Sequence, residues 1–141
     1  MSNLSDIMGG IETVLETNVT GLKAYKYLPD SVNHPLSCLI IPDGVFDPEQ
    51  AFGGNSFKFR FRLKVLLVSG DPESGFNQLT EMMDPTTTDK SIIKAIRTDP
   101  TLNGKADTSG IIAIENYGRM DLGNGQFFGF DAILEGYKTV A

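Results

Sequence analysis

Residues 57–68 read Phe-Lys-Phe-Arg-Phe-Arg-Leu-Lys-Val-Leu-Leu-Val, an alternation of apolar and basic side chains that decides the fold. Successive side chains of a β-strand point to opposite faces of the sheet, so this stretch predicts a strand with Phe57, Phe59 and Phe61 on one face. We expect this aromatic face to bear the helices and to form the core. The opposite face then carries four cations: Lys58, Arg60, Arg62 and Lys64.

The N-terminal part of the chain predicts a helix followed by two short strands. Apolar side chains in residues 3–16 recur at the spacing of one helix face. Short strands are expected at residues 21–27 and 37–41. The next segment, residues 42–56, contains several glycines and a proline and is expected to be a long loop.

Two further helices are expected after the basic strand. Asp71 is expected to cap a helix that begins at Pro72. The buried side of that helix is expected to hold Phe76, Leu79, Met82 and Met83. A second helix is predicted over residues 88–97 and should end at Asp99-Pro100. Its expected buried residues are Ile92, Ile93 and Ile96.

The last third of the chain predicts a hairpin of two strands, at residues 109–117 and 126–138. The expected turn runs through Gly118, Gly123 and Asn124-Gly125, and Asn-Gly between alternating segments is a strong hairpin signal. The side chains expected in the core are Phe128, Phe130, Ala132 and Leu134, and those on the opposite face are Asp131, Ile133 and Glu135. Together the elements predict an α+β fold, with a mixed or antiparallel sheet of about four to five strands and all three helices on one face.

Length and composition indicate one domain, residues 1–141. The chain is 40% hydrophobic and 21% charged, which suits a soluble protein with a single core. Its net charge is −6, and because an acidic surface repels phosphate we do not expect sequence-specific DNA binding. We expect no signal peptide and no membrane association. Cys38 is the only cysteine, which suits a reducing cytoplasm.

Few residue patterns suggest catalysis. His34 is the only histidine and lies four residues before Cys38. A dyad of the two is conceivable, but we favour a solvated turn histidine beside a buried strand cysteine. No zinc-binding spacing occurs, and the segment between Gly70 and Gly75 lacks the Gly-Lys-Ser/Thr ending of a phosphate loop. We therefore expect a protein that is not an enzyme and that has no metal and no cofactor.

The four cations of the central strand are the first candidate site. Glu115, Asp131 and Glu135 can lie opposite them, so one interpretation is a solvated face joined by cross-strand ion pairs. The alternatives are a subunit interface and a contact with nucleic acid. The candidate interface residues on this face are Lys58, Arg60, Arg62, Lys64, Asp131 and Glu135.

The loop at residues 42–56 is the second candidate, because it carries Phe46 and Phe52 among acidic residues. Exposed aromatic side chains on loops often anchor partners. The same phenylalanines could equally fold back onto the core.

Six stretches follow one another in a particular order over most of the chain. They are residues 21–35, residues 57–69, Met83-Asp84-Pro85, residues 99–104, Asn116-Tyr117-Gly118 and Phe128-Gly129-Phe130. Each stretch alone is only a turn or a strand pattern, so their order and spacing carry the signal. In that order they resemble the tail-terminator (tail-completion) proteins of long-tailed bacteriophages.

The resemblance implies a structural virion protein without catalytic residues. It implies a ring, commonly of six copies, at the head-proximal end of the tail tube, where it ends tube polymerisation and joins the tail to the head. The implied partners are further copies, the major tail-tube protein and the head–tail connector or neck protein. Genomic DNA would pass through the lumen without sequence-specific binding, and assembly would take place in the host cytoplasm.

Two other hypotheses stay open. Neck or head-closure proteins share the length, acidity and α+β character of this chain, and a small binding module or hydrolase is the less favoured alternative. Under the tail-terminator hypothesis, residues 42–56 are expected to order against the tube or an adjacent subunit.

Overall fold

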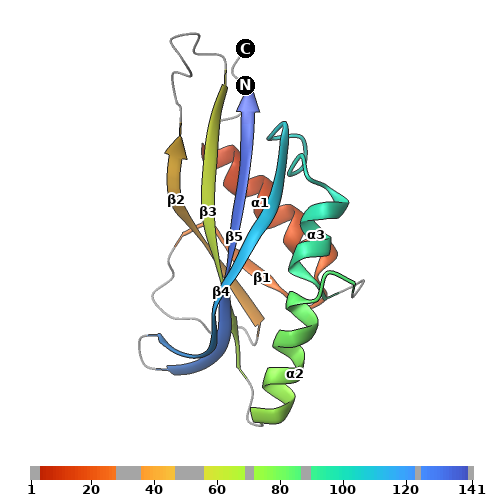
Figure 1. Cartoon of the computed structure of the whole chain (residues 1–141), viewed down its shortest axis with the longest axis vertical. Helices are drawn as coiled ribbons and strands as arrows, with labels where there is room; N and C mark the ends of the chain where they lie inside the picture. The colour runs from red at the N-terminus through yellow and green to blue at the C-terminus, as the bar shows by residue number, and fades with distance from the viewer. Residues whose placement is uncertain are drawn as a thin grey trace.

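The computed structural model describes residues 4–27, 36–46, 56–68, 72–86, 90–122 and 125–139. Within these ranges the chain forms three helices and five strands (Figure 1). In chain order they are α1 (Leu4–Asn18), β1 (Lys23–Tyr25), β2 (Leu36–Phe46), β3 (Ser56–Leu67), α2 (Pro72–Met83), α3 (Ile92–Thr98), β4 (Thr108–Leu122) and β5 (Gly125–Thr139).

The strands form one twisted sheet in the order β1-β2-β3-β5-β4 (Figure 1). β1 pairs parallel with β2, and the other three pairs are antiparallel. β3, whose alternation predicted the fold, is the central strand. The predicted α+β class, with a mixed sheet and three helices on one of its faces, is confirmed.

The core lies between the aromatic face of the sheet and the helices, as predicted. Phe59, Phe61 and Leu63 of β3 are at most 1% exposed. The same cluster takes in residues of every helix and of β5, namely Ile7, Ile11, Leu15, Leu79, Met82, Ile92, Ile96, Phe128, Phe130, Ala132 and Leu134. Each large apolar side chain buried in this way contributes about 1.5–3 kcal/mol relative to its exposed state.

The first two strands differ in length from the prediction. β1 spans only three residues of the predicted 21–27. β2 continues to Phe46, so the first five residues of the predicted loop at 42–56 are strand, and the rest of that loop before Ser56 lies outside the described residues. A register shift between Pro42 and Gly44 explains this, because a bulge accommodates a proline that cannot donate to the ladder.

The helix that follows α2 begins later than predicted. α3 starts at Ile92, not at residue 88, because Ser91 is its N-cap: the Ser91 hydroxyl oxygen accepts a 3.1 Å hydrogen bond from the Lys94 N–H. Asp99 ends the helix as predicted. The buried residues are Ile92, Ala95 and Ile96, which share one face of the helix at the i, i+3 and i+4 positions, whereas Ile93 lies off that face and is only half-buried.

The helix before it begins at Pro72, as predicted, and the proposed cap, Asp71, lies outside the described residues. On that helix Leu79 and Met82 are buried, whereas Phe76 and Met83 are half-buried and pack against the core.

The C-terminal hairpin is confirmed but is longer than predicted. Leu122 of β4 pairs with Gly125 of β5, and residues 123 and 124 lie outside the described residues. Gly118 was predicted in the turn, and this is wrong. It lies inside β4, at a register shift between Glu115 and Gly118.

One close contact joins the first helix to the turn after α3. A Cβ atom built at Gly10 would lie 2.1 Å from the Leu102 carbonyl oxygen, so only glycine fits at this position. At the neighbouring Gly9 the nearest atom would be the end of the flexible Lys26 side chain, at 3.8 Å.

Gly10→Ala is therefore expected to destabilise the protein by at least about 2 kcal/mol, because helix and turn must separate to admit the methyl group. Gly9→Ala, the matched control, should stabilise it by about 0.5–1 kcal/mol through helix propensity. Urea unfolding followed by circular dichroism measures both. Equal effects of the two substitutions would show that the contact does not constrain the fold.

Candidate functional site

The predicted charged residues lie on the sheet face that the helices leave uncovered. β3 and β5 pair with Arg60 opposite Glu135 and Lys64 opposite Asp131. Because side chains alternate along both strands, cations and carboxylates come together on the same face. We call this set, together with Lys58, Arg62 and Glu115, the charged face.

The predicted cross-strand ion pairs are present. Arg60 contacts Glu135 at 2.7 Å, and Arg62 contacts Glu115 at 3.2 Å. All three acids proposed from the sequence thus face cations, although Asp131, the acid shared by two of them, is buried. Because Arg60, Arg62 and Lys64 are paired with carboxylates, less of their positive charge is available to bind the phosphates of a nucleic acid.

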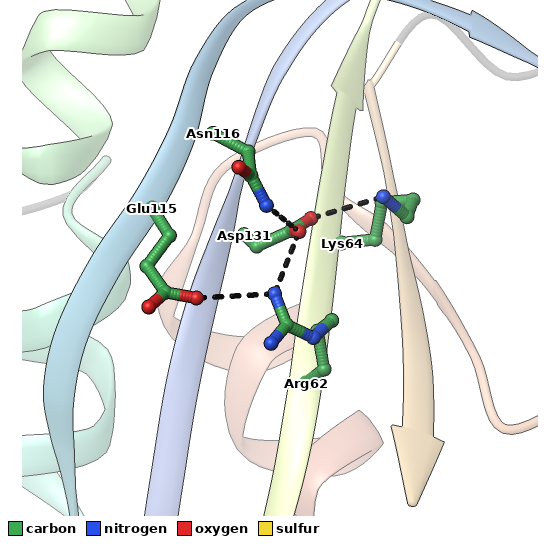
Figure 2. Close-up of polar contacts among 5 residues, drawn as sticks. All are labelled: Arg62, Lys64, Glu115, Asn116 and Asp131. Carbon is green, nitrogen blue, oxygen red and sulfur yellow. Dashed lines mark hydrogen bonds and ion pairs between the residues drawn. The ribbon is translucent and has the colours of Figure 1, made fainter. Parts of the chain in front are cut away.

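Asp131 is the centre of the charged face (Figure 2). Its side chain is only 2% exposed. It accepts hydrogen bonds from Arg62 Nη1 at 2.9 Å, Lys64 Nζ at 3.1 Å and Asn116 Nδ2 at 2.8 Å. Three donors, two of them charged, compensate for the desolvation of the carboxylate.

Asn116 was not predicted as part of this site. It has φ +56°, in the left-handed region that asparagine tolerates better than most residues, and Gly118 has φ +142°. The β4 bulge between Glu115 and Gly118 holds this backbone and brings the Asn116 amide to Asp131. The Asn-x-Gly spacing was the available signal, but Asn116 was predicted as an ordinary strand residue and only Gly118 was placed in the turn.

The environment of Asp131 changes its acidity. Burial by itself would raise the pKa of this carboxyl, but the hydrogen bonds from Asn116, Arg62 and Lys64 outweigh it and hold the pKa below its usual value. The hydrogen bond to Asp131 likewise raises the pKa of Arg62. The cluster is therefore ionised at neutral pH and holds its geometry through charge-assisted hydrogen bonds.

A surface pocket of about 470 Å³ lies where β3, β5 and β4 run side by side, at one end of the charged face. Its lining is mostly apolar and includes Ile112 and Tyr137, which are 55% and 40% exposed. Lys58 also lines it and is exposed. Among the residues that the structure describes, Lys58 is the one cation of the charged face with no ion pair.

The other end of the uncovered sheet face is apolar. Leu39, Leu66 and Phe127 form a small buried cluster there, against which Tyr25 and Ile41 pack. The face is thus divided into a pocket end, a central ionic cluster and an apolar end.

The remaining predicted site residues are not brought into this cluster. Phe46 ends β2 opposite Lys58, and Phe52 lies outside the described residues. His34 is also outside them. Cys38 is fully buried in the core, and burial raises the pKa of its thiol to about 12, so it stays protonated at neutral pH.

Comparison with known proteins adds no family. No protein-family model matches this sequence, and no curated protein matches it significantly. None of the helices in the described ranges is long and apolar enough to cross a membrane. Within those ranges, no group of three or more His, Cys, Asp or Glu side chains is placed to hold a metal ion.

Asp131→Asn should destabilise the protein, because Arg62 and Lys64 lose their shared carboxylate. Removing one partner of a fully buried pair costs about 3–5 kcal/mol, and since these two cations stay partly exposed we expect about 2–3 kcal/mol. Glu135→Gln, the control, breaks only the more exposed pair with Arg60 and should cost about 0–1 kcal/mol. Equal losses in urea unfolding would contradict a central role for Asp131.

Stability should also fall in acid. The pKa of Asp131 is lower in the folded chain than its ordinary value of 3.8, so the unfolded chain binds the proton more readily. The stabilisation is therefore complete above about pH 5 and is lost as the pH falls through the folded pKa. Unfolding free energies measured from pH 7 down to acid should drop less steeply for Asp131→Asn. Parallel curves for the two proteins would refute this assignment.

Proposed function

We propose that this chain is the tail-terminator subunit of a long-tailed bacteriophage, which forms a ring at the head-proximal end of the tail tube. The observation that carries the proposal is the order of segments along the chain. The same order runs through the fold, from an N-terminal helix and short strand to the β2–β3 pair, two helices and a final hairpin.

The uncovered face of the sheet supports a role in assembly. A ring subunit must meet neighbours on surfaces that its own elements leave free. The charged face and the adjoining pocket are not covered by helices, and they present Tyr137 and Ile112 to the surface. Large apolar side chains at a surface hollow are typical of protein–protein contacts.

The overall charge suits a subunit that surrounds DNA. With a net charge of −6 the chain lacks the excess of Lys and Arg that neutralises phosphates. Arg62 and Lys64 are also tied to Asp131. Genomic DNA could then pass through the ring without being retained, while the major tail-tube protein and the connector bind the two ends of the ring.

Electron microscopy of particles assembled without this chain tests the proposal. Overlong tubes without heads are expected, because nothing ends tube polymerisation, and supplying the wild-type chain should restore tails of normal length. Tails of normal length beside empty or leaking heads would instead indicate a neck or head-closure protein. Normal virions would reject both assignments.

A further inference from the structure

The pocket at the end of the charged face lies beside a missing side chain. Thr108 of β4 pairs with Tyr137, and Gly110 pairs with Glu135, so positions 108 and 110 both lie on the charged face. Ile112 follows at the register shift in β4 and is 55% exposed. A Cβ atom built at Gly110 would meet no atom within 4 Å. The glycine thus leaves space between Thr108 and Ile112, two of the residues that line the pocket.

The lining combines apolar walls with a few polar groups. Ile112 and the Tyr137 ring are its large exposed apolar parts, and Phe57 adds a third, partly buried one. The hydroxyl of Thr108 and the ammonium group of Lys58 are among the polar groups that line it. A hollow of about 470 Å³ with this composition is typical of sites for small organic molecules.

Lys58 supplies the charge that a ligand in the pocket would meet. Glu135 lines the same pocket, but its Oε2 accepts hydrogen bonds from Arg60 Nη2 at 2.7 Å and from Arg60 Nε at 3.3 Å. Lys58 has no ion pair with any residue that the structure describes. The pocket end of the face therefore has two cations and one carboxylate, and the carboxylate is held by Arg60.

The other acids near this face are engaged at its centre. Glu115 and Asp131 contact Arg62, and Asp131 also contacts Lys64. Asp43 of β2 acts electrostatically on the same Arg62. These three acids and two cations leave no positive charge at the centre, so the face together with Asp43 is neutral as a whole. Its positive charge lies at the pocket end, where it favours an anionic group.

We propose that this pocket binds a small aromatic carboxylate. The carboxylate of the ligand contacts Lys58 Nζ, and its ring lies against Ile112 and Tyr137 in the space beside Gly110. Aromatic rings pack well on a tyrosine ring and on aliphatic side chains, and the ammonium group gives the carboxylate a charge-assisted hydrogen bond. The inference goes beyond the proposed function and does not depend on it.

Titration of the full chain with naphthoate tests the proposal. The chain contains no tryptophan, so the fluorescence of the ligand can be followed directly. We expect a dissociation constant of about 0.1–1 mM for a ligand of this size, and weaker binding with added salt. Naphthylmethanol, which keeps the rings but lacks the charge, should bind about 10-fold more weakly. Acetate, which lacks the rings, should compete poorly.

Two substitutions separate the charge from the space. Lys58→Met should raise the dissociation constant for naphthoate about 10-fold and leave that for naphthylmethanol unchanged. Gly110→Val should weaken binding of both compounds, because its side chain occupies the free space. The valine suits a strand and meets no atom, so thermal unfolding should show an intact fold. Lys90→Met, the matched control at a lysine 49% exposed just before α3, should change neither affinity.

Three results would overturn the proposal. The first is the absence of naphthoate binding up to about 5 mM. The second is binding that Lys58→Met and Gly110→Val leave intact, or naphthylmethanol binding as tight as that of naphthoate. The third comes from backbone amide signals in nuclear magnetic resonance, where the bound ligand should shift Lys58, Ile112 and Tyr137. Shifts confined to Leu39 and Leu66, at the apolar end of the face, would place the ligand elsewhere.

Discussion

The structure depends on the two-sided character of β3. This strand is paired along its length with β2 on one side and β5 on the other, so its side chains can only point toward the helices or away from them. The phenylalanines on one face supply the surface on which all three helices pack. The cations on the other face cannot enter an apolar core, because an unpaired charge there would cost several kcal/mol. One strand thereby decides where the core lies and which face stays uncovered.

Asp131 makes the pairing of β3 with β5 specific. Apolar side chains alone would tolerate a one-residue shift of the strand pairing wherever the face onto which they move is also apolar. A one-residue shift here would turn the carboxylate toward the helix-covered face, away from Arg62 and Lys64. The ionic cluster therefore disfavours the wrong register, a role that buried polar groups fill in some other proteins. The bulge that brings in Asn116 adds a third donor, which the paired strands alone would not supply.

The sequence predicted the parts of the fold that follow from periodicity. The alternation in β3 and β5, the apolar stripe of α1 and the start of α2 at Pro72 were all read correctly, because local spacing determines them. The errors came where a distant contact or one cap decides the outcome. Ser91 starts α3 later than the apolar pattern suggested, and a bulge lets β2 continue past Pro42.

The candidate site was predictable in composition but not in arrangement. Opposite charges on facing strands implied ion pairs with Asp131, Glu135 and Glu115, and these are present. Asn116 was missed because its role depends on a left-handed backbone at a bulge inside a strand, whereas the alternation predicted a regular strand through this residue. The pocket was missed because its walls, Lys58, Tyr137 and Ile112, are far apart in sequence and meet only through the register of three strands.

The buried thiol of Cys38 has a practical consequence. The thiolate is the form that attacks an alkylating reagent. A pKa of about 12 keeps the Cys38 thiol protonated in the folded chain, and complete burial keeps reagents away from it. The residue lies on β2 within the main core, and no other cysteine competes for reagent. The rate at which it is alkylated thus reports how often this part of the sheet opens, and the native chain carries its own probe of local unfolding.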